Sequence, residues 1–115
     1  MTSTLDRLEA RRDEAIREYT ALVGDPGCCA KVDLQVGWLE KKLEKIYQYT
    51  LKQTKKDLTP RQIADLWTKT GQICDFFIDL VRSMASQSNC PVTYDNLLDV
   101  RLAANEKADF HRCGQ

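Results

Sequence analysis

The stretch LTPRQI, residues 58–63, decides the fold, because it sets where the longest predicted helix begins. Thr59 belongs to the residue types that cap helix N-termini, and Pro60 suits the first helical position, where its missing N–H costs nothing. Gln62 stands where its side chain can reach back to the backbone of Thr59 and complete a capping box. The stretch therefore predicts that a turn ends and a helix starts at Pro60.

Apolar residues follow this start at spacings of four and three, which is the period of a helical seam. The seam consists of Ile63, Trp67, Thr70, Cys74, Phe77, Val81 and Met84. Leu66, Ile73 and Leu80 add a parallel stripe, so the apolar face of this helix is wide. The pattern predicts a helix over residues 60–87 that lies in the middle of a helical bundle.

A second long helix is predicted on the other side of the turn, over residues 27–56. Its start is marked by Asp25 and Pro26, a capping residue followed by a proline suited to the first turn. Its seam has the same alternation and consists of Cys29, Val32, Val36, Leu39, Leu43, Ile46 and Thr50. The two helices are expected to form a hairpin of rods, each roughly 40 Å long.

Shorter helices are predicted on both flanks, over residues 4–23 and 94–110, followed by a flexible tail at 111–115. Short links between successive helices favour antiparallel neighbours. The 115 residues fit one domain, and no strand-like alternation interrupts the helical period. We therefore expect an all-α, antiparallel up-down-up-down four-helix bundle built on the long central hairpin.

The tip of the hairpin, residues 47–67, is the predicted interaction surface. The flanking helices are shorter and are expected to cover the end far from the turn, which would leave the tip bare. An exposed apolar patch marks an interface, and the simplest partner is a second copy of the chain in a homodimer. The residues expected to bind a partner are Tyr47, Tyr49, Lys52, Lys55, Lys56, Arg61 and Trp67. With rings that anchor and cations that steer, this pattern favours a non-enzymatic adaptor or regulatory module.

The charge of the tip leaves other partners open. Between positions 40 and 69, eight Lys or Arg residues stand against four Asp or Glu. Basic residues interleaved with aromatic ones can bind single-stranded nucleic acid, and they can also bind an acidic protein. The whole chain has 17 basic and 17 acidic residues, and this balance argues against a dedicated nucleic-acid protein. Weak nucleic-acid binding is therefore the second alternative function.

Three of the five cysteines raise a chemical question. In the hairpin register, Cys28 and Cys29 at the start of the second helix come level with Cys90, just past the end of the third. A helix N-terminus stabilises a thiolate and lowers its pKa. The placement allows a redox-active thiol, a disulfide to Cys90 or a thiolate metal site, against the interpretation that Cys29 is a small apolar residue of the seam. A metal site lacks a fourth ligand, because His111, the sole histidine, is expected to lie far along the bundle. A thiol-based redox switch is therefore the first alternative function.

The remaining reactive side chains form no predicted catalytic site. Cys74 belongs to the seam and is expected to be inert, and His111 and Cys113 lie near the end of the sequence with nothing to orient them. Asp75 and Asp79 share one face of a helix, which is the usual pattern of a solvated surface. No phosphate loop or dinucleotide fingerprint occurs. We expect no enzymatic activity, no metal and no cofactor.

The location expected from the sequence is the cytoplasm. No apolar run approaches the roughly 18 residues of a membrane span, and the first residues do not have the pattern of an export signal. Reduced thiols and no membrane contact are the corresponding expectations.

Overall fold

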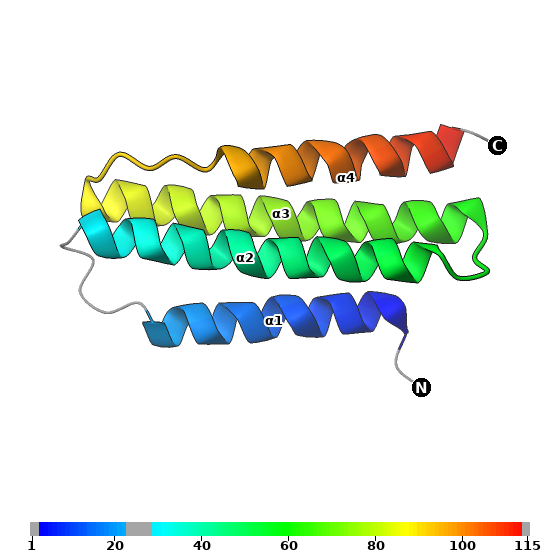
Figure 1. Cartoon of the computed structure of the whole chain (residues 1–115), viewed down its shortest axis with the longest axis horizontal. Helices are drawn as coiled ribbons and strands as arrows, with labels where there is room; N and C mark the ends of the chain where they lie inside the picture. The colour runs from blue at the N-terminus through cyan, green and yellow to red at the C-terminus, as the bar shows by residue number, and fades with distance from the viewer. Residues whose placement is uncertain (1–2, 23–28, 114–115) are drawn as a thin grey trace.

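The computed structural model describes residues 3–22 and 29–113, and these residues contain four helices and no strand (Figure 1). The helices are α1 (Thr4–Leu22), α2 (Cys29–Thr54), α3 (Pro60–Ser88) and α4 (Asp95–Cys113). The prediction of an all-α bundle on a central hairpin is confirmed, because α2 and α3 are the longest helices and lie side by side in opposite directions. Asp25 and Pro26, the predicted start signal of the second helix, lie outside the described residues.

The start of α3 has the predicted capping box. The Gln62 N–H donates to the Thr59 hydroxyl oxygen at 3.1 Å, and the Thr59 N–H donates to Gln62 Oε1 at 2.9 Å. Pro60 occupies the first helical position, and Leu58 packs against the core just before it. The turn between α2 and α3 is therefore held by its own side chains as well as by the helices it joins.

The two predicted seams face each other and form the core. Leu39, Leu43 and Phe77 have no exposed surface, and neither do Thr50 and Thr70. The hydroxyl oxygens of the two threonines lie 2.8 Å apart, so one donates to the other. Each hydroxyl also lies within hydrogen-bonding distance of the backbone carbonyl four residues earlier in its helix. Both threonine hydroxyls thus have hydrogen-bond partners in the interior, where an unpaired hydroxyl would lower the free energy of unfolding.

The bundle is flattened, with α2 and α3 in the middle. α1 packs against both of them on one side, and α4 packs against both on the other (Figure 1). Within the described residues, α1 and α4 do not contact each other. The molecule accordingly measures 49 × 29 × 16 Å. The wide apolar face predicted for α3 is used by all three other helices.

Small residues allow α4 to approach α3 closely. Ala104 and Ala108 of α4 are buried, as are Ala64 and Gly71 of α3. A Cβ atom placed on Gly71 would lie 2.6 Å from Asn105 Oδ1, which is too close for a real contact. Gly71 therefore leaves room for an α4 side chain.

α1 lies nearer the turn than the sequence predicts. The Arg11 guanidinium is 4.0 Å from the centre of the Tyr49 ring, and Glu18 pairs with Lys42 at 2.9 Å. In this register the N-terminus of α1 reaches the turn, where Ser3 lines a pocket together with Leu58. The expectation that the first helix covers only the end far from the turn is wrong.

α4 is displaced in the same direction, because the chain leaves α3 in an extended path. Asn89 ends α3 with a φ of 55°, the left-handed conformation that commonly follows a helix. The non-helical segment after it runs back along α3, so that Arg82 Nε donates to the Tyr94 hydroxyl at 3.1 Å. α4 therefore begins part-way along α3 and extends towards the turn.

The C-terminal part of the described chain is helix rather than the predicted tail. α4 continues to Cys113, and Arg112 Nη2 donates to the Thr68 hydroxyl of α3 at 2.7 Å. This contact extends the packing of α4 along α3, and it favours a helix that continues beyond the predicted end at residue 110. Leu102 of α4 faces away from the core, and its side chain is 58% exposed.

Candidate functional site

The aromatic half of the predicted interaction surface lies inside the molecule. Trp67 is only 2% exposed, and its ring packs against Tyr47 with 5.2 Å between centroids. Ala104 and Ala108 of α4 belong to the same buried cluster. The expectation of a bare apolar tip is therefore wrong, and the apolar surface invoked for a homodimer at the tip is covered by the chain itself.

Tyr49 is covered from the opposite side, by α1. The guanidinium of Arg11 lies over its ring, and the phenol oxygen is buried without a hydrogen-bond partner among the described residues. Gln53, one turn further along α2, is buried and has an equally unpaired Oε1. Tyr49 is therefore half-buried beneath α1, and Gln53 is buried on α2, so neither residue contributes a free polar surface.

The cationic half of the predicted surface is exposed. Lys52, Lys55, Lys56 and Arg61, here called the basic turn, form no ion pair with any described residue. The Lys55 and Lys56 N–H groups donate to the carbonyls of Lys52 and Gln53, so the backbone that carries these cations is closed into a turn. The structure separates the seven predicted residues into three buried or half-buried rings and four cations in solvent.

Two residues of α4 join the basic turn, although the sequence did not single them out. Arg112 and Arg61 line a shallow depression together with Ala64 and Asp65. Phe110, two residues before Arg112 in the last turn of α4, is 71% exposed. The helical spacing of the buried residues Ala104 and Ala108 indicates only weakly that α4 continues to Arg112. The sequence predicts a tail at residues 111–115 instead.

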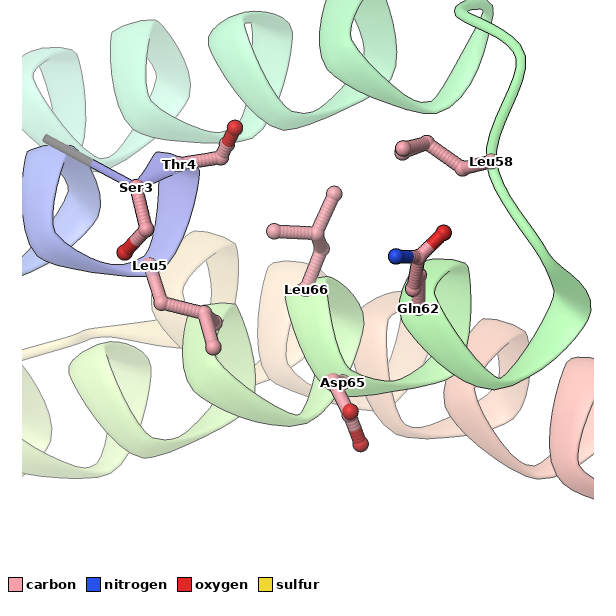
Figure 2. A pocket seen from close by; sticks show the side chains of 7 residues that line it. All are labelled: Ser3, Thr4, Leu5, Leu58, Gln62, Asp65 and Leu66. Atoms are coloured by element: carbon pink, nitrogen blue, oxygen red, sulfur yellow. The ribbon is translucent and has the colours of Figure 1, made fainter. Parts of the chain in front are cut away.

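A small pocket of about 170 Å³ opens beside the turn, between the first turns of α1 and α3 (Figure 2). Leu5, Leu58 and Leu66 supply its apolar lining. Ser3 Oγ accepts the Asp6 N–H and Gln62 belongs to the capping box, and the Asp65 carboxylate also lines the pocket and would repel an anion. The pocket suits an apolar side chain better than an anion.

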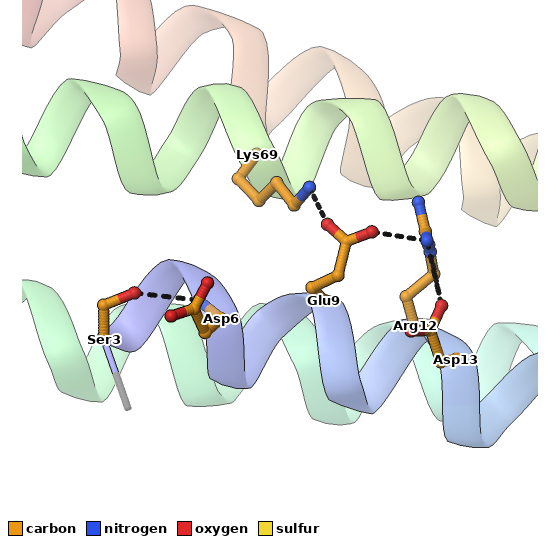
Figure 3. A network of polar contacts seen from close by, with 6 residues as sticks. All are labelled: Ser3, Asp6, Glu9, Arg12, Asp13 and Lys69. Carbon is orange, nitrogen blue, oxygen red and sulfur yellow. Dashed lines mark hydrogen bonds and ion pairs between the residues drawn. The ribbon is translucent and has the colours of Figure 1, made fainter. Parts of the chain in front are cut away.

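A charged network fastens α1 to α3 (Figure 3). Glu9 accepts a hydrogen bond from Lys69 of α3 and forms an ion pair with Arg12 of its own helix, and Arg12 also pairs with Asp13 at 2.9 Å. The Arg12 guanidinium also lies 5.4 Å from the centre of the Phe76 ring of α3, a cation–π contact that adds to the attachment of α1. The network has a structural role and leaves no unpaired carboxylate aimed at a ligand.

The opposite end of the molecule holds a disulfide between Cys29 and Cys90, with 5.6 Å between their Cα atoms. The sequence left this bond as one of several alternatives, and the expectation of reduced thiols is wrong for these two residues. Cys29 is the first residue of α2 and is exposed, whereas Cys90 is only 6% exposed. Cys28 lies outside the described residues.

The other thiols differ sharply in environment. Cys74 has no exposed surface, and burial raises the pKa of its thiol to about 12, so it is inert as predicted. Cys113 is exposed at the end of α4, and His111 lies beside the Phe110 ring, far from the disulfide. Among the described residues, no three His, Cys, Asp or Glu side chains are grouped to hold a metal ion.

Comparison with known proteins gives no relative from which to transfer a function: no family model, no curated protein and no solved structure matches the chain. Within the described residues, no helix has the length and apolar character needed to cross a membrane.

Proposed function

We propose that the protein is a small, non-enzymatic helical interaction module that binds an acidic protein partner through the basic turn. The observation that supports this function is the exposure of four cations on one turn without ion pairs to the described residues. Unpaired cations at one end of an otherwise neutral chain attract an acidic surface over distances of about 8 Å at physiological salt. The turn is held by the capping box, so little ordering is needed on binding.

Apolar surface next to the basic turn provides a hydrophobic area that such a partner can cover. The exposed ring of Phe110 and the leucine-lined pocket at the starts of α1 and α3 lie at the same end of the molecule as the cations. They replace Tyr47 and Trp67 as the proposed anchors. A partner helix with acidic residues around a few apolar ones matches this combination.

Self-association and a cytoplasmic location remain proposals of the same kind. A homodimer is now expected to use another surface, because Trp67 is buried and Tyr47 and Tyr49 are half-buried within one chain. Light scattering at low and high salt tests it: a mass of two chains that falls to one at high salt supports a dimer held by charge. A single-chain mass at both salt concentrations contradicts self-association. Fractionation of the cells that make the protein tests the location.

The binding proposal is tested by charge reversal with a matched control. Lys55→Glu combined with Lys56→Glu changes the basic turn, whereas Lys31→Glu combined with Lys41→Glu makes the same change on exposed positions of α2 away from the turn. The probe is a labelled amphipathic helical peptide rich in Glu and Leu, followed by fluorescence anisotropy. We expect the turn variant to weaken binding at least about tenfold and the control to change it less than about twofold. Equal losses in both variants would contradict the proposal.

A labelled single-stranded oligonucleotide in the same assay separates the nucleic-acid alternative. Tighter binding of the oligonucleotide than of the peptide, with an affinity that falls steeply as salt rises, would favour that alternative.

A further inference from the structure

We propose that Cys29 Sγ is a thiol–disulfide exchange site, at which an external dithiol attacks and opens the Cys29–Cys90 bond while the bundle stays folded. This inference does not depend on the function proposed for the basic turn, which lies at the other end of the molecule (Figure 1). It depends on the different surroundings of the two sulfur atoms and on where the bond lies in the fold.

The two ends of the disulfide differ in access. Cys29 is exposed at the first position of α2, and Cys90 is 6% exposed and packs with the main hydrophobic core. The Ser88 carbonyl oxygen lies 3.6 Å from Cys90 Sγ and adds to its cover. An incoming thiolate can therefore reach the sulfur of Cys29 but not that of Cys90 without moving the core.

The exchange balances in two steps. The thiolate of the dithiol attacks Cys29 Sγ, a mixed disulfide forms, the Cys29–Cys90 bond breaks, and its electron pair leaves on Cys90, which takes a proton from water. The second thiol of the same molecule loses its proton, attacks the mixed disulfide and displaces Cys29 as a thiolate. The dithiol is thereby oxidised to a disulfide, and the protein ends with two reduced cysteines. The N-terminus of α2 stabilises the departing Cys29 thiolate.

The position of the bond allows it to open without loss of the bundle. It joins the first residue of α2 to the non-helical segment between α3 and α4. The core next to it is held independently, since Val32 and Val81 have no exposed surface and Tyr19 donates a hydrogen bond to Met84 Sδ at 3.2 Å. Opening the bond therefore releases the segment after α3 and the first turn of α2, while the seams stay packed.

The alternative is a purely structural disulfide, which a reductant reaches only after the chain unfolds. The two cases give different kinetics. Reduction of a structural bond follows the population of unfolded chain and rises steeply with urea, with the slope of the unfolding equilibrium. Reduction at an accessible site proceeds in the folded protein and is nearly independent of urea below the unfolding transition.

The experiment treats the full-length protein with dithiothreitol at several urea concentrations below the transition and counts free thiols by alkylation and mass spectrometry. We expect the reduction rate to change less than about twofold across that range. In a parallel experiment with reduced glutathione, peptide mapping should find the first mixed disulfide on Cys29. Cys28→Ser removes the neighbouring thiol that could exchange with Cys29, and Cys113→Ser removes the exposed thiol of α4.

A reduction rate that rises with the unfolding slope would overturn the inference. A first adduct on Cys90 would overturn it as well. If either serine variant fails to fold, the urea dependence of the wild-type protein still decides between the two cases.

Discussion

The Cys29–Cys90 bond is expected to supply a large part of the stability of the folded chain. It joins positions 61 apart in the sequence and so encloses the whole of α2, the turn and the whole of α3 in one covalent loop. Closing a loop of this length removes roughly 4 kcal/mol of conformational entropy from the unfolded state at 25 °C. Cys29→Ala removes the bond at an exposed helical position, where the substitution itself should cost less than about 0.5 kcal/mol.

Urea denaturation followed by circular dichroism measures the loss. We expect the free energy of unfolding of Cys29→Ala to fall by roughly 4 kcal/mol, and the reduced wild-type protein to fall by a similar amount. With a slope of about 2 kcal/mol per molar urea, the midpoint should move down by about 2 M. Cys113→Ala, which removes an exposed unbonded thiol, serves as the control and should stay within about 0.5 kcal/mol of the wild type. A loss below about 1 kcal/mol in Cys29→Ala would refute the argument from loop closure.

Three further predictions concern the interior and the helix surfaces. Gly37→Ala should raise the free energy of unfolding by about 1 kcal/mol, because Ala favours a helix more than Gly does and no neighbour lies within 4 Å of the new Cβ. Gly71→Ala should raise it less, because the new Cβ would meet Asn105. Equal gains in urea denaturation would contradict a packing role for Gly71. Thr50→Val should cost about 1 kcal/mol by removing the hydrogen bond between the two hydroxyls, while the Thr70 hydroxyl keeps its bond to the Leu66 carbonyl. Changing both residues to Val should cost less than the sum of the single changes, so additive losses would count against the pair. Burial raises the pKa of Cys74 to about 12 from the usual 9.0, so the unfolded chain loses this proton first as pH rises. Stability should therefore fall between pH 9 and pH 12, and Cys74→Ala should flatten that fall in thermal denaturation at each pH; an unchanged slope would contradict the assignment.

The central hairpin was predictable because periodicity alone determines which residues of a long helix are buried. Val36 and Leu43 in α2 and Phe77 in α3 were assigned to the seams from their spacing, and all three are buried. The capping box at Thr59 was also predictable, since it depends on residues only three positions apart. Both inferences rest on local sequence.

The site was less predictable, because it depends on how far each flanking helix slides along the hairpin. Spacing identifies the buried face of α1 but does not tell whether Arg11 comes level with Tyr49 or with a residue further from the turn. The extended path after Asn89 moves α4 over Trp67 and has no periodic signal at all. Cys29 was placed level with Cys90, but heptad spacing cannot distinguish a packed thiol from a bonded one.

The absence of any contact between α1 and α4 in the described part of the chain has a consequence for how the protein opens. Neither outer helix holds the other in place, so each can detach from the central pair by itself. Detachment of α1 breaks the contacts of Glu9 and Tyr19 with α3. It leaves α4 packed against α3 through Ala104 and Ala108. We therefore expect two separate partially open forms, and a protease or a competing helix that captures one of them need not disturb the other.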